Sequence, residues 1–155
     1  MNERLTLEDF TVGDTVRSPA RTVTAEDLKM TDEILVRERP ASASYSDRTP
    51  SRGILGELFL LAMSSGLMFR AGGAALPPST ELLWSITDVR FEKRVETGDT
   101  IRLESEVVSL ANVDESRGLI GVRHTAFDQR SAPVFAFSTK MVVPRRGGGD
   151  APCTG

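Results

Sequence analysis

One carboxylate stands in an apolar segment where it could act as an acid or a base. Glu57 lies within residues 54–70, a stretch rich in Leu, Met, Phe and Ala. A carboxyl group buried among such side chains has a raised pKa and could remove a proton from a substrate. If Glu57 instead falls in the first turn of a helix, its charge would merely complement the positive end of the helix dipole. Both interpretations stay open.

A polar segment before that stretch carries several hydroxyl and carboxyl groups. Residues 37–52 include Ser42, Ser44, Tyr45 and Asp47, and Tyr45 is the only tyrosine of the chain. Their side chains could donate hydrogen bonds to a carbonyl or hydroxyl group of a substrate. The same residue types are also typical of turns. The sequence favours neither interpretation.

Two glycines stand where this polar segment meets the apolar one. Gly53 and Gly56 have no Cβ, so a substrate carbonyl could approach the backbone closely at the start of a helix. The alternative is that they only let the chain enter the helix.

Histidine and cysteine chemistry is limited to one residue of each type. His124 is the only histidine, and histidine is the usual general acid or base near pH 7. His124 shares the parity of Ile120, Val122 and Ala126, so these side chains point to the same face of the predicted strand. We therefore favour a half-buried structural role for His124. The single cysteine, Cys153, cannot form an internal disulfide, and the chain has no cluster of Cys and His for zinc. We expect no metal and no cofactor.

Length and charge restrict the fold and the partners. The 155 residues suffice for one domain with its own core. A net charge of -3 argues against nucleic acid as a partner. The longest apolar stretch, residues 54–69, is shorter than the roughly 20 residues that span a bilayer, which indicates a buried helix and no membrane partner. The N-terminus resembles no signal peptide, so we expect a cytoplasmic protein.

Two helices are expected in the first half of the chain. Residues 24–27 resemble a capping box, with Thr24 at the N-cap and Asp27 in place of Glu, and predict a helix to about Val36. The second helix covers residues 54–70, is apolar on every face and is therefore expected to be buried all round. It should end at the glycines 72 and 73. Residues 5–14 are expected to be a short extended piece with a Gly-Asp turn.

The remaining segments show the alternation of β-strands. Within residues 100–110, the side chains of Ile101, Leu103, Ser105 and Val107 alternate with the charged ones of Arg102, Glu104 and Glu106, which indicates a strand with one face in water. Further strands are expected at residues 15–24, 81–95, 119–128 and 134–143. This pattern predicts an α+β domain in which an antiparallel sheet wraps around the long central helix.

Four motifs, in this order and spacing, resemble the MaoC-like dehydratase/hydratase family, whose members have the hot-dog fold. They are Glu8–Asp14, Arg21–Asp27, Ala62–Leu67 and Asp88–Thr100. The resemblance implies a single hot-dog domain at residues 1–143, followed by a flexible Gly-rich tail at residues 144–155.

The resemblance also implies the ligand and the assembly. The ligand would be an acyl thioester of coenzyme A or of an acyl carrier protein, with the acyl chain beside the central helix. The site would lie at the junction of a homodimer or of a hot-dog heterodimer. Backbone amides at the helix N-terminus would polarise the thioester carbonyl. Arg37 and Arg39 could contact a phosphate of the carrier, or could simply be exposed.

The chain departs from this family where its catalytic residues are expected. Active members carry an Asp and a His in the pattern Asp-x-x-Pro-x-His. Around Pro40, the chain has Arg37 in the Asp position and Ser42 in the His position. A second expected His, at the start of the helix, is replaced within residues 55–57. The usual dyad is therefore not retained.

Three functions remain open on this basis. The first is a dehydratase-like lyase with an altered site, acting on an acyl or polyketide thioester in bacterial specialised metabolism. Its catalytic residues would be Glu57, Ser42, Tyr45 and Asp47, and its substrate-binding residues Arg37, Ser44, Gly53 and Gly56. The second is a non-catalytic, substrate-binding subunit of a heterodimer. The third is a hot-dog thioesterase that uses Glu57.

Overall fold

The structure, a computed structural model of the chain, describes residues 5–35 and 56–147. Its elements in chain order are the 3-10 helix η1 (Leu7–Asp9), β1 (Thr15–Arg17), β2 (Arg21–Thr22), α1 (Ala25–Leu35), α2 (Glu57–Ala71), β3 (Leu82–Phe91), β4 (Thr100–Asn112), β5 (Arg117–Phe127) and β6 (Pro133–Pro144). The four long strands and both helices confirm the α+β class predicted from the sequence. The predicted strand at residues 15–24 is broken into β1 and β2, with Pro19 between them.

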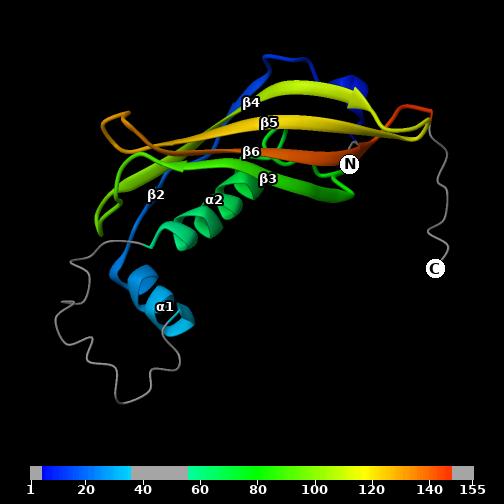
Figure 1. Cartoon of the computed structure of the whole chain (residues 1–155). Helices are drawn as coiled ribbons and strands as arrows, with labels where there is room; N and C mark the ends of the chain where they lie inside the picture. Colours follow the sequence, from blue (N-terminus) through cyan, green and yellow to red (C-terminus); the bar gives the residue numbers. More distant parts are fainter. Residues whose placement is uncertain (1–4, 36–55, 148–155) are drawn as a thin grey trace.

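All strands pair antiparallel in one sheet. The order is β1-β4-β5-β6-β3, and β2 also pairs with β4. Short turns join β4 to β5 and β5 to β6, so these three strands form a continuous meander at the centre of the sheet (Figure 1). β3 reaches the far side of β6, where Leu82 pairs with Val142 and Phe91 with Phe135. β3 is thus an edge strand of the described sheet.

Helix α2 packs against one face of the curved sheet (Figure 1). Its buried side chains recur every three or four residues and are Leu60, Met63, Ser64, Leu67 and Met68. The opposite side of the helix is exposed in the single chain, with Leu58 at 69% and Phe69 at 75%. The prediction of a helix buried all round is therefore wrong for half of its surface, because the sheet contacts only one side.

The core lies between α2 and the sheet. Inward side chains of the meander alternate with outward ones, as the sequence pattern predicted. They form two apolar groups, one beneath α2 around Leu67, Leu103 and Phe135, and one towards η1 around Phe10 and Ile120. No described helix is long and apolar enough to cross a membrane.

The ends of the helices agree with their sequence signals. At the start of α1, the Asp27 amide donates to Thr24 Oγ1 at 3.3 Å, and the Thr24 amide donates to Asp27 Oδ2 at 2.9 Å, as expected for a capping box. Helix α2 ends at Gly72, whose φ of 62° is left-handed and therefore suits glycine. The extended piece expected at residues 5–14 instead contains η1, because Asp9 accepts from the Thr6 amide and closes a helical turn.

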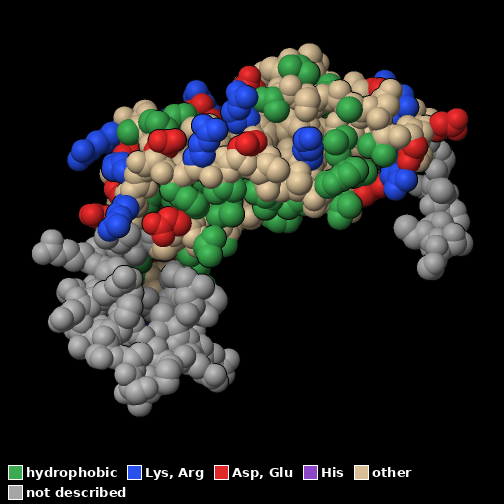
Figure 2. All heavy atoms as spheres, viewed as in Figure 1, with side chains coloured by type: hydrophobic (Ala, Val, Ile, Leu, Met, Phe, Trp, Pro, Cys, Tyr) green, Lys and Arg blue, Asp and Glu red, His purple; other side chains and the backbone are tan. Residues whose placement is uncertain are grey.

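The edge strand β3 presents large apolar side chains to solvent. Six of them are more than a third exposed: Leu82, Leu83, Trp84, Ile86, Val89 and Phe91. Figure 2 shows hydrophobic side chains gathered along this margin of the molecule. β3 also bulges twice against β6, and in the second bulge Asp88 has a left-handed φ of 54°. The described part of the chain leaves this edge without a neighbouring strand.

Candidate functional site

The N-terminus of α2 is the part of the predicted site that the structure describes. Gly56 is the N-cap, with an extended backbone at φ -63° and ψ 140°. No described side chain caps this helix end, so the amides of its first turn lack a side-chain acceptor. Such amides point along the helix axis and favour a partial negative charge placed before them.

Glu57 is the first residue of α2 and is exposed. The burial that the sequence suggested for its carboxylate is therefore absent in the single chain. The reason is geometric, since the α2 residues that face the sheet begin with Leu60, one turn later. In this position Glu57 complements the helix dipole, and a catalytic role would need a ligand or a partner to cover it.

The other predicted site residues lie outside the described residues. They are Arg37, Ser42, Ser44, Tyr45, Asp47 and Gly53, all within residues 36–55. Of the predicted set, the described residues therefore include Gly56 and Glu57.

His124 lies at the centre of the core, fully buried. Its Nδ1 is 2.8 Å from Ser105 Oγ, and its Nε2 is 2.8 Å from Thr139 Oγ1. The ring also stacks on Phe137, with centroids 4.6 Å apart. A neutral imidazole satisfies both contacts, because one ring nitrogen donates to a hydroxyl and the other accepts from one.

Burial lowers the pKa of His124 to about 4. The ring is thus neutral at pH 7 and has no exposed atom. The structural role favoured from the sequence agrees with this position, although the residue is buried more deeply than expected. The alternation of residues 101–107 placed Ser105 on the buried face of its strand. Nothing in the sequence identified Thr139 as the second hydroxyl group that contacts His124.

A second buried polar residue, Asp128, closes the turn between β5 and β6. Its Oδ1 accepts from the amides of Arg130 and Ala132 at 2.9 and 3.0 Å, and its Oδ2 lies 2.7 Å from Lys93 Nζ. The Lys93 ammonium, assisted by these amides, lowers the pKa of Asp128 to about 2. Sequence reasoning missed this pair, because 35 residues separate its members.

Replacing Lys93 by Met is expected to lower the Tm by about 3 °C at pH 7. The buried carboxylate of Asp128 would then lose its cationic partner. The loss should shrink as the pH falls from 3.8 towards 2, where the Asp128 carboxylate becomes protonated. Thermal unfolding followed by circular dichroism measures both effects. Lys140→Met, which removes an exposed lysine from β6, is the control; equal losses in the two variants would contradict the prediction.

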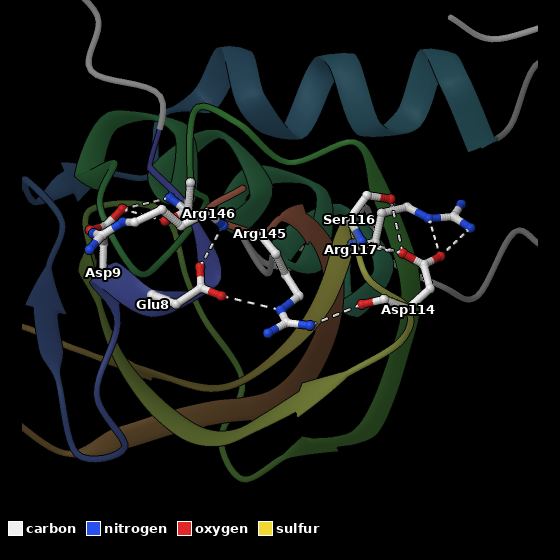
Figure 3. Close-up of polar contacts among 8 residues, drawn as sticks. Glu8, Asp9, Asp114, Ser116, Arg117, Arg145 and Arg146 are labelled. Atoms are coloured by element: carbon white, nitrogen blue, oxygen red, sulfur yellow. Dashed lines mark hydrogen bonds and ion pairs between the residues drawn. The ribbon is translucent and has the colours of Figure 1, made fainter. Parts of the chain in front are cut away.

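Ion pairs connect η1 to the chain that follows β6. This group, which we call the terminal clasp, comprises Glu8, Asp9, Arg145 and Arg146 (Figure 3). Arg145 Nε donates to Glu8 Oε1 at 3.2 Å, the Arg146 amide donates to Glu8 Oε2 at 2.8 Å, and the Arg146 side chain pairs with Asp9. These contacts lower the pKa of Glu8, the Arg146 amide contributing most. The clasp is an exposed structural contact.

The clasp is continued by the turn between β4 and β5. Arg145 Nη1 donates to the Asp114 carbonyl at 3.1 Å, and Arg117 Nε donates to the Asp114 carboxylate at 2.8 Å (Figure 3). Beyond Val143, Pro144 still belongs to β6, and Arg145 and Arg146 make the contacts of the clasp. Residues 148–155 lie outside the described part.

No protein-family model and no curated protein matches the sequence. Solved structures do match the fold. A MaoC-like dehydratase from Rhodospirillum rubrum superposes with a TM-score of 0.72 at 20% identity, over 92% of this chain and 98% of that one. The chain has the hot-dog fold of the MaoC-like dehydratases.

Two further solved structures match the fold. The R-hydratase PhaJ1 from Pseudomonas aeruginosa matches with a TM-score of 0.64 at 18% identity, over 98% of this chain and 96% of that one. A Mycobacterium tuberculosis protein with a double hot-dog fold matches with a TM-score of 0.71 at 20% identity, over 96% of this chain but 51% of that one. In terms of the hot-dog fold, α2 corresponds to the central helix, and the six strands form the sheet that wraps around it.

Proposed function

We propose that this hot-dog protein is a lyase of the dehydratase/hydratase type that acts on an acyl thioester of coenzyme A or of an acyl carrier protein. The observation that carries the proposal is the fold match over nearly the whole chain to a MaoC-like dehydratase and to an R-hydratase. The N-terminus of α2, which no described side chain caps, supports it, because its amides can bind the oxygen of a thioester carbonyl.

The reaction assigns a role to each part of this site. Dehydration removes a proton from the carbon next to the thioester and expels the hydroxyl of the next carbon as water; hydration is the reverse. Amides at the start of α2 would stabilise the enolate oxygen that forms when the proton leaves. Glu57 is the described residue beside them that can accept or return a proton. Ser42, Tyr45 and Asp47 remain proposed donors to the hydroxyl, and Arg37, Ser44, Gly53 and Gly56 proposed substrate contacts.

A second candidate is thioester hydrolysis. It is favoured by the position of Glu57, since a carboxylate at the first turn of α2 could activate water against a carbonyl held by the same amides. A third, a non-catalytic subunit that binds the acyl chain in a heterodimer, follows from the loss of the Asp/His dyad. A cytoplasmic location and a role in polyketide metabolism belong to the proposal as well.

Mass spectrometry of thioesters incubated with the purified protein distinguishes these functions. We expect 3-hydroxyacyl or polyketide thioesters to lose the mass of one water, or enoyl thioesters to gain it. Release of a free acid and a free thiol would instead indicate a thioesterase. Binding of the thioester without turnover would favour the non-catalytic subunit.

Substitution of Glu57 by Gln is expected to reduce turnover at least 100-fold, because the amide cannot exchange a proton with the substrate. The matched control is Glu26→Gln, which removes the same charge from the first turn of α1. If Glu57 serves only the helix dipole, the two variants should turn over substrate at the wild-type rate and differ from it only slightly in stability. Initial rates on the substrate found above measure the difference.

A further inference from the structure

A hollow of about 190 Å³ lies on the outer face of the sheet, which is the face opposite α2, where β1, β4 and β5 run side by side. Its floor is the backbone around Val16 and Ser105, which pair across β1 and β4 and whose side chains turn to the core. Its walls are outward side chains of the flanking positions: Thr15, Arg17, Glu104, Glu106, Arg123 and Thr125. The sheet separates this hollow from the site at the start of α2.

The walls hold charges of both signs in alternating positions. Arg17 of β1 lies opposite Glu104 of β4, and one row further along Glu106 of β4 lies opposite Arg123 of β5. Residues opposite one another in antiparallel strands point to the same side, so all four side chains stand on the outer face. Figure 2 shows Lys and Arg side chains standing among Asp and Glu side chains over the strands of the sheet.

The first of these two pairs is closed. Arg17 Nε lies 3.1 Å from Glu104 Oε1, and Arg102 Nη2 lies 3.5 Å from the same oxygen. Glu104 therefore has two cationic neighbours, and its side chain is only 30% exposed. This pair forms a wall of the hollow and leaves little capacity for a ligand.

The second pair is open. Arg123 Nη1 lies 4.0 Å from Glu106 Oε2, which is too long for an N–H···O hydrogen bond. Neither side chain makes a hydrogen bond to another described residue, and the two are 61% and 49% exposed. The guanidinium thus keeps its donors, and the carboxylate its acceptors, for a molecule that enters the hollow.

We propose that this hollow binds a free α-amino acid with a small apolar side chain. The carboxylate of the amino acid would accept hydrogen bonds from Arg123, and its ammonium group would donate to Glu106. Both ligand charges would then be met, and both protein charges would stay paired through the ligand. A simple anion would face the carboxylate of Glu106, and a simple cation the guanidinium of Arg123, so the pair favours a zwitterion over either.

The rest of the lining sets the size and polarity of the ligand. The half-buried ring of Phe127 also lines the hollow and offers it an apolar surface, with the Arg102 guanidinium 5.2 Å from the ring centroid. The hydroxyls of Thr15 and Thr125 can donate to the ligand carboxylate or accept from its ammonium group. The volume has room for about six waters at roughly 30 Å³ each, which suits amino acids from alanine to leucine.

Titration of the full chain with four probes, followed by backbone amide NMR, tests this site. L-Alanine and L-leucine are the zwitterions, and sodium acetate and methylammonium chloride each carry one of their two charges. We expect saturable shifts at residues 15–17, 104–106 and 123–125 with the amino acids at millimolar concentration, and affinities about 10-fold weaker or less with either single-charge probe. Absence of saturable shifts at these amides would overturn the proposal.

Substitutions at the open pair separate a zwitterion site from a simple ion site. Arg123→Met and Glu106→Gln should each weaken the binding of the amino acids by about 10-fold or more. The matched controls are Arg17→Met in the closed pair and Glu115→Gln in the turn between β4 and β5, which should change it by less than about twofold. Circular dichroism verifies that each variant is folded.

One pattern would replace the proposal by a different site. If acetate binds as tightly as alanine and Glu106→Gln leaves both affinities unchanged, the hollow is an anion site and no amino-acid site. The inference is independent of the proposed function, because the titration contains no thioester. Loss of amino-acid binding in Arg123→Met should leave any turnover of thioesters intact, since Arg123 lies on the opposite face of the sheet from α2.

Discussion

Lowering the pH from 7 to 5 is expected to reduce the free energy of unfolding by about 2 kcal/mol through His124 alone. The pKa of this histidine is about 4 in the folded chain and about 6.5 when unfolded. The unfolded state therefore binds the proton more readily, and stability falls as the pH drops from 6.5 towards 4. Above pH 6.5 both states are neutral, and the contribution is complete and constant.

The described groups that contact the ring provide no compensating charge. His124 is flanked by the hydroxyls of Ser105 and Thr139 and by the Phe137 ring, and the α2 residues buried against the sheet are uncharged. An imidazolium there would keep two hydroxyl contacts but no carboxylate. The carboxylate of Asp128, with its pKa of about 2, titrates below this range.

Urea unfolding at several pH values measures this effect. His124→Gln, whose amide can donate and accept but does not titrate, should show a nearly flat stability between pH 7 and pH 5, whatever its absolute stability. Because the chain has one histidine, its proton resonance can be followed without ambiguity and should not titrate above pH 5. An equal pH dependence in the wild type and in the variant would contradict the prediction.

Truncation of Phe135 to Ala is expected to cost about 3–5 kcal/mol of stability. The ring is fully buried and stacks on Phe91 and Phe137, with centroids 5.7 and 5.6 Å apart. Its removal would leave a cavity between β6 and α2 and would also loosen the contact that holds the edge strand β3. A domain of this size has a total stability of about 5–15 kcal/mol, so the variant should be close to unfolding.

The matched control for this truncation is Phe69→Ala. Phe69 is 75% exposed on the outer side of α2, and its loss should change stability by less than 1 kcal/mol. Denaturant unfolding of both variants, measured at the same protein concentration, provides the comparison. Similar losses for the two would indicate that the outer side of α2 is covered as firmly as the core.

Local sequence signals predicted most of the fold. The alternation around Leu103 and the capping box at Thr24 depend on neighbouring residues, so the strands and helix ends could be placed to within a few residues. The broken strand at Pro19 and the turn η1 were missed, since each depends on a few hydrogen bonds that have no periodic pattern.

The site was harder to predict, because it depends on relations across the sequence. Because α2 has apolar residues on every face, the sequence predicted burial on all sides. The position of the sheet shows that Leu58 and Phe69 remain exposed. The exposure of Glu57 follows from the same geometry. Lys93 and Asp128 meet only because β5 and β6 turn beside the end of β3.

The strand order also has a kinetic consequence. β4, β5 and β6 are joined by two short turns, so each pairs with a strand that is near it in the sequence. β3 pairs with β6 across a much longer separation, since about 60 residues lie between Leu82 and its partner Val142. Because closing a long loop costs more entropy than closing a short one, the meander should already be ordered in the folding transition state, while β3 docks late. Mutations in the turns of the meander would then slow folding, and those in β3 would mainly speed unfolding.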